Sequence, residues 1–253
     1  MQTITFVGNG NMALSIAKGL KETYKIEVVG RSFEKLDLFE KNLGIKIEKH
    51  MMSNYDMTDK TIMLCVKPAN IQEIATRLNG RAKVIYSVLA GTSVQKLKVN
   101  LNPHAVVRTM PNLAASVNKS MTTLTGDEEY KIEAQALLGT IGKTRWLSSE
   151  KEIDIATALA GSGPAYLALI AEAFTDGAVK QGLKRDDAMA IMRGLFEGFG
   201  DLIQDIHPAL LKDGVMSPAG TTAAGYGALE DGNVRSSCIN AIEKAYKKAV
   251  ELS

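Results

Sequence analysis

Short apolar runs alternate with amphipathic stretches through the first part of the chain. The runs Thr3–Val7, Ile26–Val29, Thr61–Val66 and Ala82–Val88 are rich in β-branched and other apolar residues, and a shorter run lies at 106–107. A continuous apolar run such as Thr61–Val66 is typical of a strand that is buried on both faces. The pattern therefore predicts the strands of an internal sheet.

Helical periodicity fills the intervals between these runs. Apolar residues recur at Met12, Ile16 and Leu20 after the first run, and at Phe33, Leu36, Phe39 and Leu43 after the second. This spacing places each set on one face of a helix. Strands that alternate with helices predict an α/β fold, with a parallel sheet joined by right-handed crossovers.

The pattern changes near residue 150. The segment Ser148–Glu150 has the residue types of a helix N-cap, and strand-like runs nearly vanish beyond it. In the last helical stretch one apolar stripe contains Val234, Cys238, Ala241, Ile242, Ala245 and Ala249. We therefore predict two domains, an α/β domain over residues 1–150 and an all-helical domain over residues 151–253.

The predicted helical domain is short and rich in small side chains. A domain of this size buries little apolar surface by itself, and small domains often gain stability through oligomerisation. Its helices could pack on a second copy of the chain or only on the first domain. We favour the first arrangement and predict a homodimer.

Composition narrows the class of protein. The 253 residues are 45% hydrophobic and 23% charged, as in ordinary globular proteins. The net charge of +2 leaves no basic surplus for binding a nucleic-acid backbone. Two cysteines, Cys65 and Cys238, argue against a disulfide scaffold and suit a reducing compartment, so we expect a cytoplasmic protein.

One segment has the apolar character of a membrane helix. Residues 155–171 carry no charged side chain, and this length is close to the shortest that spans a bilayer. The segment is richer in alanine than in leucine, and Gly161–Pro164 interrupts it. We interpret it as a helix buried in protein and expect no membrane partner.

The first candidate site is a glycine-rich turn that follows Thr3–Val7. It has the pattern G-x-G-x-x-A and consists of Gly8, Asn9, Gly10, Asn11, Met12 and Ala13. In this pattern the first glycine permits a tight turn, the second lets a pyrophosphate approach the backbone, and the alanine keeps helix and strand close. The helix N-terminus then faces the anion. The strand–turn–helix context predicts a Rossmann-type dinucleotide site, and a turn that binds nothing is the alternative.

The residues after the second run bear on the choice of cofactor. NAD enzymes usually place Asp or Glu there to bind the ribose hydroxyls. This chain has Arg31 and Ser32 instead, which suit the 2′-phosphate of NADPH. Arg31 could also be a solvated surface residue, and Glu34 or Asp37 could turn back to a 2′-hydroxyl. We predict NADPH, with NADH as the alternative cofactor.

Three further predicted strands end in residues that suit the nicotinamide half of the cofactor. In an open α/β sheet, ligands bind beyond the carboxyl ends of the strands. Each of these strand ends is common by itself, but three at one edge favour a binding site. The residues are Val66, Lys67 and Pro68, then Ala90 and Gly91, then Met110, Pro111 and Asn112.

The last candidate site is the segment Ser217–Thr222, which precedes a predicted helix in the second domain. Its hydroxyls and backbone N–H groups could cradle a carboxylate, because helix N-termini attract anions. A helix cap without a ligand fits the same spacing equally well.

Taken together, these motifs resemble those of the Δ1-pyrroline-5-carboxylate reductase family over essentially the whole chain. The matching segments are Gly8–Met12, Val66–Pro68, Arg108–Asn112, Gly161–Tyr166, His207–Asp213, Ser217–Thr222 and Ala228–Glu230. The segment Ser217–Thr222 is the most specific, since it looks like the family's signature. The family has two glycines after the proline, whereas this chain has Ala219 at the first of them. If that position requires a positive φ, alanine costs energy there.

The resemblance implies a reaction and an assembly. The reaction is NAD(P)H-dependent hydride transfer to the cyclic imine 1-pyrroline-5-carboxylate, which gives L-proline in the last step of proline biosynthesis. The helical domain matches the family's intertwined dimerisation domain, and rings of dimers occur in the family.

The resemblance also implies residue roles. The substrate residues would be Ser217, Gly220, Thr221, Thr222 and Asp205, with Asp205 near the amine. Thr222, which would lie near the ring nitrogen as well as the carboxylate, is the catalytic candidate. The turn 8–13 would hold the pyrophosphate and residues 31–32 the ribose phosphate. The nicotinamide would be flanked by Lys67, Ala90 and Asn112.

Two alternatives belong to other classes. A β-hydroxyacid dehydrogenase would need a catalytic lysine in the helical domain, where Lys180 and Lys184 lie near an expected helix end. A non-catalytic NADP-sensing protein would not need the Ser217–Thr222 cradle. The Cys and His residues have no metal-ligand spacing, so we expect no metal, and we expect His207 to begin a helix.

Overall fold

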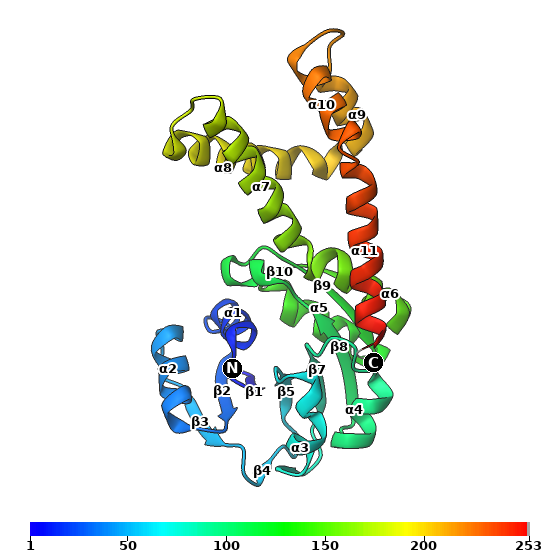
Figure 1. The fold of residues 1–253 in the computed structure, drawn as a ribbon. Coiled ribbons are helices and arrows are strands. Elements are labelled where there is room, and N and C mark those ends of the chain that lie inside the picture. The colour runs from blue at the N-terminus through cyan, green and yellow to red at the C-terminus, as the bar shows by residue number, and fades with distance from the viewer. Residues whose placement is uncertain (252–253) are drawn as a thin grey trace. The chain divides into compact units, whose positions relative to one another are not determined.

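An eight-stranded sheet forms the centre of the N-terminal part of the chain in the computed structural model, which describes residues 1–251 (Figure 1). Its strand order is β10-β9-β8-β7-β5-β1-β2-β3. The strands are β1 (Thr3–Val7), β2 (Lys25–Gly30), β3 (Glu48–Met51), β5 (Thr61–Leu64), β7 (Val84–Ser87), β8 (Ala105–Met110), β9 (Ser120–Gly126) and β10 (Gly142–Trp146). A second, two-stranded sheet pairs β4 (Tyr55–Asp56) with β6 (Leu78–Asn79).

The pairing of these strands is parallel, with one exception. The order β3-β2-β1-β5-β7-β8 is that of a doubly wound dinucleotide-binding sheet. The predicted Rossmann-type fold is therefore confirmed. A uniformly parallel sheet is wrong for β8 and β9, which pair antiparallel. The chain returns from β8 through the short 3-10 helix η2 (Leu113–Val117) and not through a crossover helix, so the next strand runs back beside it.

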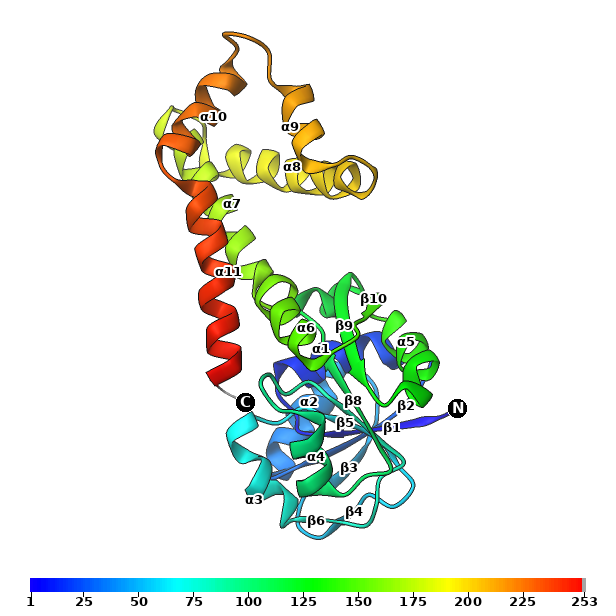
Figure 2. The same ribbon diagram turned by 90° about the vertical axis from the view of Figure 1, so that its right-hand side faces the viewer.

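Helices cover both faces of this sheet (Figure 2). The helices are α1 (Asn11–Leu20), α2 (Phe33–Leu43), α3 (Ile71–Ala75), α4 (Val94–Leu101) and α5 (Lys131–Gly139). Helices α1, α2 and α5 pack on strand residues such as Phe6, and α3 and α4 pack on residues such as Ile62. Two core clusters result, one on each face. Three of the four residues predicted on the α2 face are buried, but Phe33, at the start of the helix, is 54% exposed.

The remaining short helical elements follow the strands and connect them to the next elements. They are the 3-10 helices η1 (Pro68–Asn70) and η3 (Glu128–Tyr130), the helix α6 (Glu150–Ala156) and the π-helix η4 (Thr157–Gly161). The N-cap predicted before residue 150 is present, because the Ser149 hydroxyl accepts a hydrogen bond from the Glu152 N–H at 3.2 Å.

The C-terminal part is helical throughout its described residues. Its helices are α7 (Gly163–Lys180), α8 (Arg185–Asp205), α9 (Pro208–Val215), α10 (Thr221–Asp231) and α11 (Val234–Glu251). Within residues 165–242 of the single chain, the buried residues are Thr175 and Ala188. Large apolar side chains such as Leu169 and Ile239 are more than 60% exposed. One copy of the chain therefore leaves most of this apolar surface uncovered.

Two compact units make up the chain. The first contains residues 1–164 and the C-terminal residues from 243, and the second contains residues 165–242. Helix α6 and the π-helix η4 belong to the first unit. A functional boundary at residue 150 therefore stays a prediction, since the compact units divide at other positions.

One helical stretch, Glu150–Lys180, is long and apolar enough to cross a membrane by length and composition. A single helix of this kind is weak support for a membrane protein, because helices of soluble proteins meet the same criterion. The exposed apolar side chains of α7 are equally suited to packing against protein.

Candidate active site

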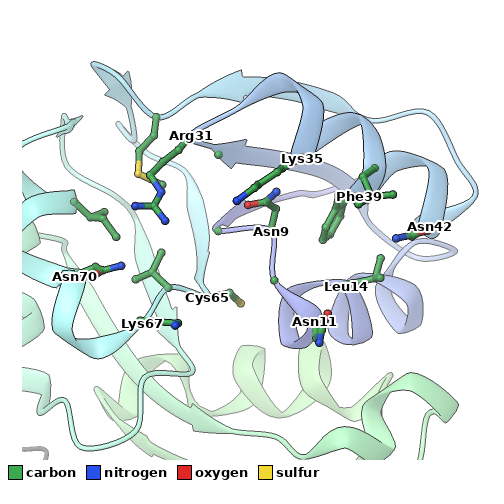
Figure 3. Close-up of a pocket in the computed structure, with 17 residues that line it drawn as sticks. Asn9, Asn11, Leu14, Arg31, Lys35, Phe39, Asn42, Cys65, Lys67 and Asn70 are labelled. Carbon is green, nitrogen blue, oxygen red and sulfur yellow. The ribbon is translucent and has the colours of Figure 1, made fainter.

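A pocket of about 600 Å³ lies at the carboxyl ends of β1, β2 and β5 (Figure 3). This is the point where the strand order reverses, which is where doubly wound sheets bind their ligands. The predicted cofactor residues that line it are Gly8, Asn9, Gly10, Asn11, Arg31, Val66 and Lys67. The structure thus brings together the glycine-rich turn and the ends of two further strands.

The two glycines of the turn have different physical roles. Gly8 has a φ of +106°, and a β-carbon on it would lie 2.4 Å from the carbonyl oxygen of Cys65. Gly10 has an ordinary φ of −81°, and a β-carbon there would meet nothing within 4 Å. The fold therefore requires glycine at Gly8, whereas the open space beside Gly10 fits a pyrophosphate.

The beginning of α1 is open to an anion. Gly10 is its N-cap and supplies no side-chain hydrogen bond, and the first turn of the helix has no acidic residue. The N–H groups at the start of a helix lack intrahelical partners and carry partial positive charge. These N–H groups suit the phosphates of a dinucleotide.

Positive side chains surround the same pocket. Arg31, Lys35 and Lys67 enter it from the end of β2, from α2 and from the end of β5 (Figure 3). None of the described residues that line the pocket is acidic. The pocket is therefore suited to a ligand with more negative charge than NAD, such as one with a 2′-phosphate.

Two details of α2 bear on the choice between NADPH and NADH. Asp37, considered as a ribose ligand, instead lies 2.7 Å from the ammonium of Lys49, and neither Glu34 nor Asp37 lines the pocket. Lys35, which we did not predict, does line it. Its sequence signal is its place in the first turn of α2, directly after the strand end that precedes Arg31.

Four predicted cofactor residues lie beside the pocket without lining it. Ala13 is buried between α1 and the sheet, as the motif predicts, and Met12 packs against the same core. Ser32 is the N-cap residue of α2, and Pro68 begins η1. Their described positions support the shape of the turn and the strand ends.

The predicted nicotinamide residues Ala90, Gly91, Met110, Pro111 and Asn112 follow β7 and β8, and they do not line this pocket. Gly91 has a φ of +63°. The amide nitrogen of Asn112 donates to the Ala160 carbonyl at 3.0 Å, and its amide oxygen accepts from the Ala114 N–H at 3.1 Å. In the described structure this side chain holds η4 against the start of η2.

The segment Ser217–Thr222 forms a tight turn before α10 in the second unit. Ala219 has a φ of +59°. A positive φ is unfavourable for alanine, so the departure from the family's glycine costs energy here. The Gly220 N–H donates to the Ser217 carbonyl at 3.0 Å, and a β-carbon on Gly220 would lie 2.4 Å from the Ser217 hydroxyl. A side chain at position 220 would therefore require the Ser217 hydroxyl to move, whereas the φ of −81° is open to any residue.

The turn leaves the first N–H groups of α10, at Thr221 and Thr222, without a side-chain cap. Asp205, the last residue of α8, is exposed in the same unit. As expected, His207 begins a helix, since its Nδ1 accepts from the Ala209 N–H at 3.2 Å. The predicted cofactor and substrate residues thus lie in separate compact units.

A polar cluster lies at the amino-terminal half of β2, away from the cofactor pocket. Ligand atoms of Glu27, Glu48 and His50 all lie within 4.8 Å of one another. Burial alone would raise the pKa of Glu27, but hydrogen bonds from Thr5 and Lys60 outweigh it and lower the pKa. Lys60 lies 3.1 Å from Glu27, and Lys25 pairs with Glu48, so ammonium groups already neutralise both carboxylates.

The doubly wound sheet and its cationic, glycine-lined pocket define an oxidoreductase that binds a nicotinamide dinucleotide. A family described as NADP oxidoreductase coenzyme F420-dependent matches residues 3–91, and a family described as pyrroline-5-carboxylate reductase dimerisation matches residues 150–252. The chain belongs to the pyrroline-5-carboxylate reductase family, because it is 33% and 35% identical to the enzymes of Synechocystis sp. and Glycine max.

These similarities extend over nearly full lengths. The alignments cover 97% and 99% of this chain and 96% of each relative. The crystal structure of the 1-pyrroline-5-carboxylate reductase of Streptococcus pyogenes has 32% sequence identity and a TM-score of 0.87, and 98% of each chain is covered. The predicted family, the oxidoreductase class, the NADP type of cofactor and a homo-oligomeric assembly are confirmed. The roles of individual residues remain predictions.

Proposed function

We propose that this chain reduces 1-pyrroline-5-carboxylate to L-proline with NADPH, in the last step of proline biosynthesis. The observation that carries the proposal is full-length identity of 33–35% to relatives named pyrroline-5-carboxylate reductase. An anion-binding pocket in the first unit and an uncapped helix start in the second supply the two kinds of site that the reaction needs.

The residues of the pocket fit NADPH. The space beside Gly10 and the N–H groups at the start of α1 would hold the pyrophosphate, and Arg31 and Lys35 would contact the 2′-phosphate. Lys67, which enters the pocket from the end of β5, would flank the nicotinamide. When bound, NADPH would supply the hydride.

The turn before α10 would hold the substrate carboxylate. The Ser217 hydroxyl and the N–H groups of Thr221 and Thr222 are donors, and the helix N-terminus adds partial positive charge. Thr222 would place its hydroxyl near the ring nitrogen, where it guides a proton to the imine. Asp205 would lie near the resulting amine. A protonated imine is the better hydride acceptor, so these groups act on the chemical step as well as on binding.

The proposal extends to the assembly and its surroundings. The uncovered apolar faces of α7, α8 and α11 support packing against a second copy, and dimers could assemble further into a ring. Such packing would cover apolar surface that could otherwise contact lipid, and the net charge of +2 gives no general attraction for a nucleic acid. We place the protein in the cytoplasm.

The direct test is oxidation of NADPH in the presence of pyrroline-5-carboxylate, with NADH as the comparison cofactor. A separate assay measures reduction of NADP+ in the presence of 3-hydroxyacids. Removing one hydrogen bond to a charged group costs about 1.5–3 kcal/mol, so Thr222→Ala should lose about ten- to a hundredfold in kcat/KM. Thr222→Ser keeps the hydroxyl and should retain most activity. If the hydroxyl only holds the carboxylate, KM rises and kcat stays unchanged.

Two results would contradict the proposal. Binding of NADP without turnover of the imine would indicate a sensing protein. Preferential oxidation of 3-hydroxyacids would indicate the dehydrogenase alternative. A well-folded Thr222→Ala protein with unchanged kcat and KM would remove this residue from the site while leaving the reaction in place.

A further inference from the structure

A buried arginine connects the sheet to two other elements of the first unit. Arg108 lies in β8, and its side chain is 3% exposed. Its guanidinium donates to Glu150 at 3.1 Å and to Asp154 at 2.6 Å. Both carboxylates belong to α6, so the fork of one arginine fixes the first turns of that helix to the sheet.

Glu150 makes a second contact, to a different part of the fold. The carboxylate oxygen that accepts from Arg108, Oε1, also accepts from the backbone N–H of Val94 at 2.8 Å. Val94 is the first residue of α4, and its N–H is among the groups that have no partner within a helix. Arg108 therefore holds the carboxylate that fixes the beginning of α4.

The loop between β7 and α4 is consequently anchored at both ends. At its start, the Ser87 carbonyl accepts from the Thr109 hydroxyl at 3.2 Å and the Ser87 hydroxyl accepts from the Leu89 N–H at 3.3 Å. At its end, Glu150 holds Val94. Between these anchors Gly91 is buried with a positive φ, so the loop has a specific conformation that the anchors must maintain.

We propose that Arg108 and Glu150 are positioning residues for the nicotinamide half of the site. This inference rests on the proposed function, because Ala90 and Gly91 in the anchored loop are the residues expected beside the nicotinamide. Neither Arg108 nor Glu150 need contact the cofactor. They act by keeping the loop at the height above the sheet that hydride transfer requires, since small displacements of reacting groups slow a reaction strongly.

The chain offers a matched pair of variants. Glu150→Ala removes the acceptor of the Val94 N–H and one partner of Arg108. Asp154→Ala removes the other partner of Arg108 and leaves the Val94 contact in place. Glu150→Gln keeps an oxygen that can accept from Val94 but removes the charge. A purely structural role would make the two single-carboxylate losses equivalent, whereas a positioning role separates them.

Three measurements on the full-length protein test the proposal. In Glu150→Ala we expect kcat with NADPH and pyrroline-5-carboxylate to fall about tenfold, because a displaced loop misplaces the reacting groups. The affinity for 2′,5′-ADP, which probes the Arg31 end of the pocket, should change by less than about twofold. Amide hydrogen exchange over residues 88–94 should quicken by about fivefold or more. Glu150→Gln should recover most of each value, and Asp154→Ala should lower the melting temperature without changing kcat.

The proposal is overturned if Glu150→Ala keeps wild-type kcat and wild-type exchange over residues 88–94. It is also overturned if Asp154→Ala loses as much kcat as Glu150→Ala, since the effect would then be a general loss of structure. Failure of the proposed function has a different signature. In that case the wild-type protein does not reduce the imine, while hydrogen exchange over residues 88–94 still reports whether Glu150 fixes the loop.

Discussion

The α-carbon of Gly8 faces the carbonyl of Cys65 so closely that a β-carbon would lie 2.4 Å from its oxygen. The first strand and the end of β5 therefore meet at a point where no side chain fits. Two residues on, the backbone at Gly10 faces open space. The same turn thus contains one glycine for the fold and one for the ligand.

Gly8→Ala and Gly10→Val should consequently fail in different ways. Gly8→Ala combines a backbone clash with an unfavourable φ and should lower the free energy of unfolding by at least about 1–3 kcal/mol. Gly10→Val should keep a near-wild-type melting temperature but fill the pyrophosphate space, and NADPH affinity should fall at least about tenfold. Thermal unfolding and cofactor titration separate the two. Equal NADPH affinity in folded Gly10→Val would remove this turn from the cofactor site.

The cations of the pocket should set the preference for NADPH. Arg31→Ala and Lys35→Ala each remove a charge-assisted contact to the 2′-phosphate, so KM for NADPH should rise about tenfold or more. KM for NADH, which lacks this phosphate, should change little. Lys41→Ala, on the same helix but outside the pocket, is the control. Parallel changes for both cofactors would contradict a contact with the 2′-phosphate.

Ala219 should be a site where glycine stabilises the protein. The left-handed conformation costs a residue with a β-carbon about 1–2 kcal/mol, and part of this is recovered when glycine replaces it. We expect Ala219→Gly to raise the melting temperature slightly. The control is Ala223→Gly inside α10, where glycine should destabilise by about 0.5–1 kcal/mol. Destabilisation of similar size by both substitutions would show that the φ at position 219 is not strained.

The lowered pKa of Glu27 predicts a contribution to stability that depends on pH. A carboxyl with a folded pKa below its unfolded value stabilises the native state fully above the unfolded pKa, and the contribution is lost as pH falls through the folded pKa. The unfolded reference is 4.5. The melting temperature difference between wild type and Glu27→Gln should therefore be largest near neutral pH and should shrink below 4.5. A constant difference across this range would mean that the charge of Glu27 contributes nothing.

The apolar stripe of α11 should be needed for assembly. Ala241 lies on that stripe, and a glutamate there would place an unpaired charge in the expected interface, at a cost of several kcal/mol. We expect sedimentation to show a wild-type dimer and a shift toward monomer in Ala241→Glu. Lys244→Glu, which changes charge on the exposed side of the same helix, should leave the dimer intact. A monomeric wild-type protein would disprove the interface.

The parts of the fold that the sequence predicts well are those with a local signal. The turn at Gly8 and Gly10 has a fixed spacing, and β1, β2, β5 and β7 are apolar because they are buried on both faces. Strands β3 and β10 gave no such signal. Their sequences, EKHM and GKTRW, lie at the two edges of the sheet, where side chains are partly solvated and need not be apolar.

The residues of the candidate site also differ in whether the sequence carries a local signal for them. Arg31 follows a strand end and could be found by position, and Lys35 could have been found from its place in the first turn of the helix that follows. The contact of Arg108 with Glu150 joins residues 42 positions apart, and no periodicity connects them. Likewise, the positive φ of Ala219 depends on how the turn closes onto Ser217. The sequence indicates that alanine would cost energy at a positive φ, but it does not show whether the φ is positive.

The near absence of buried side chains in residues 165–242 has a consequence for the life of a newly made chain. Helices that find their apolar partner surface only on another molecule fold to completion at a rate that depends on concentration. Until that encounter, each chain presents exposed leucine and isoleucine side chains to chaperones and to aggregation. Dilution should therefore inactivate the protein slowly.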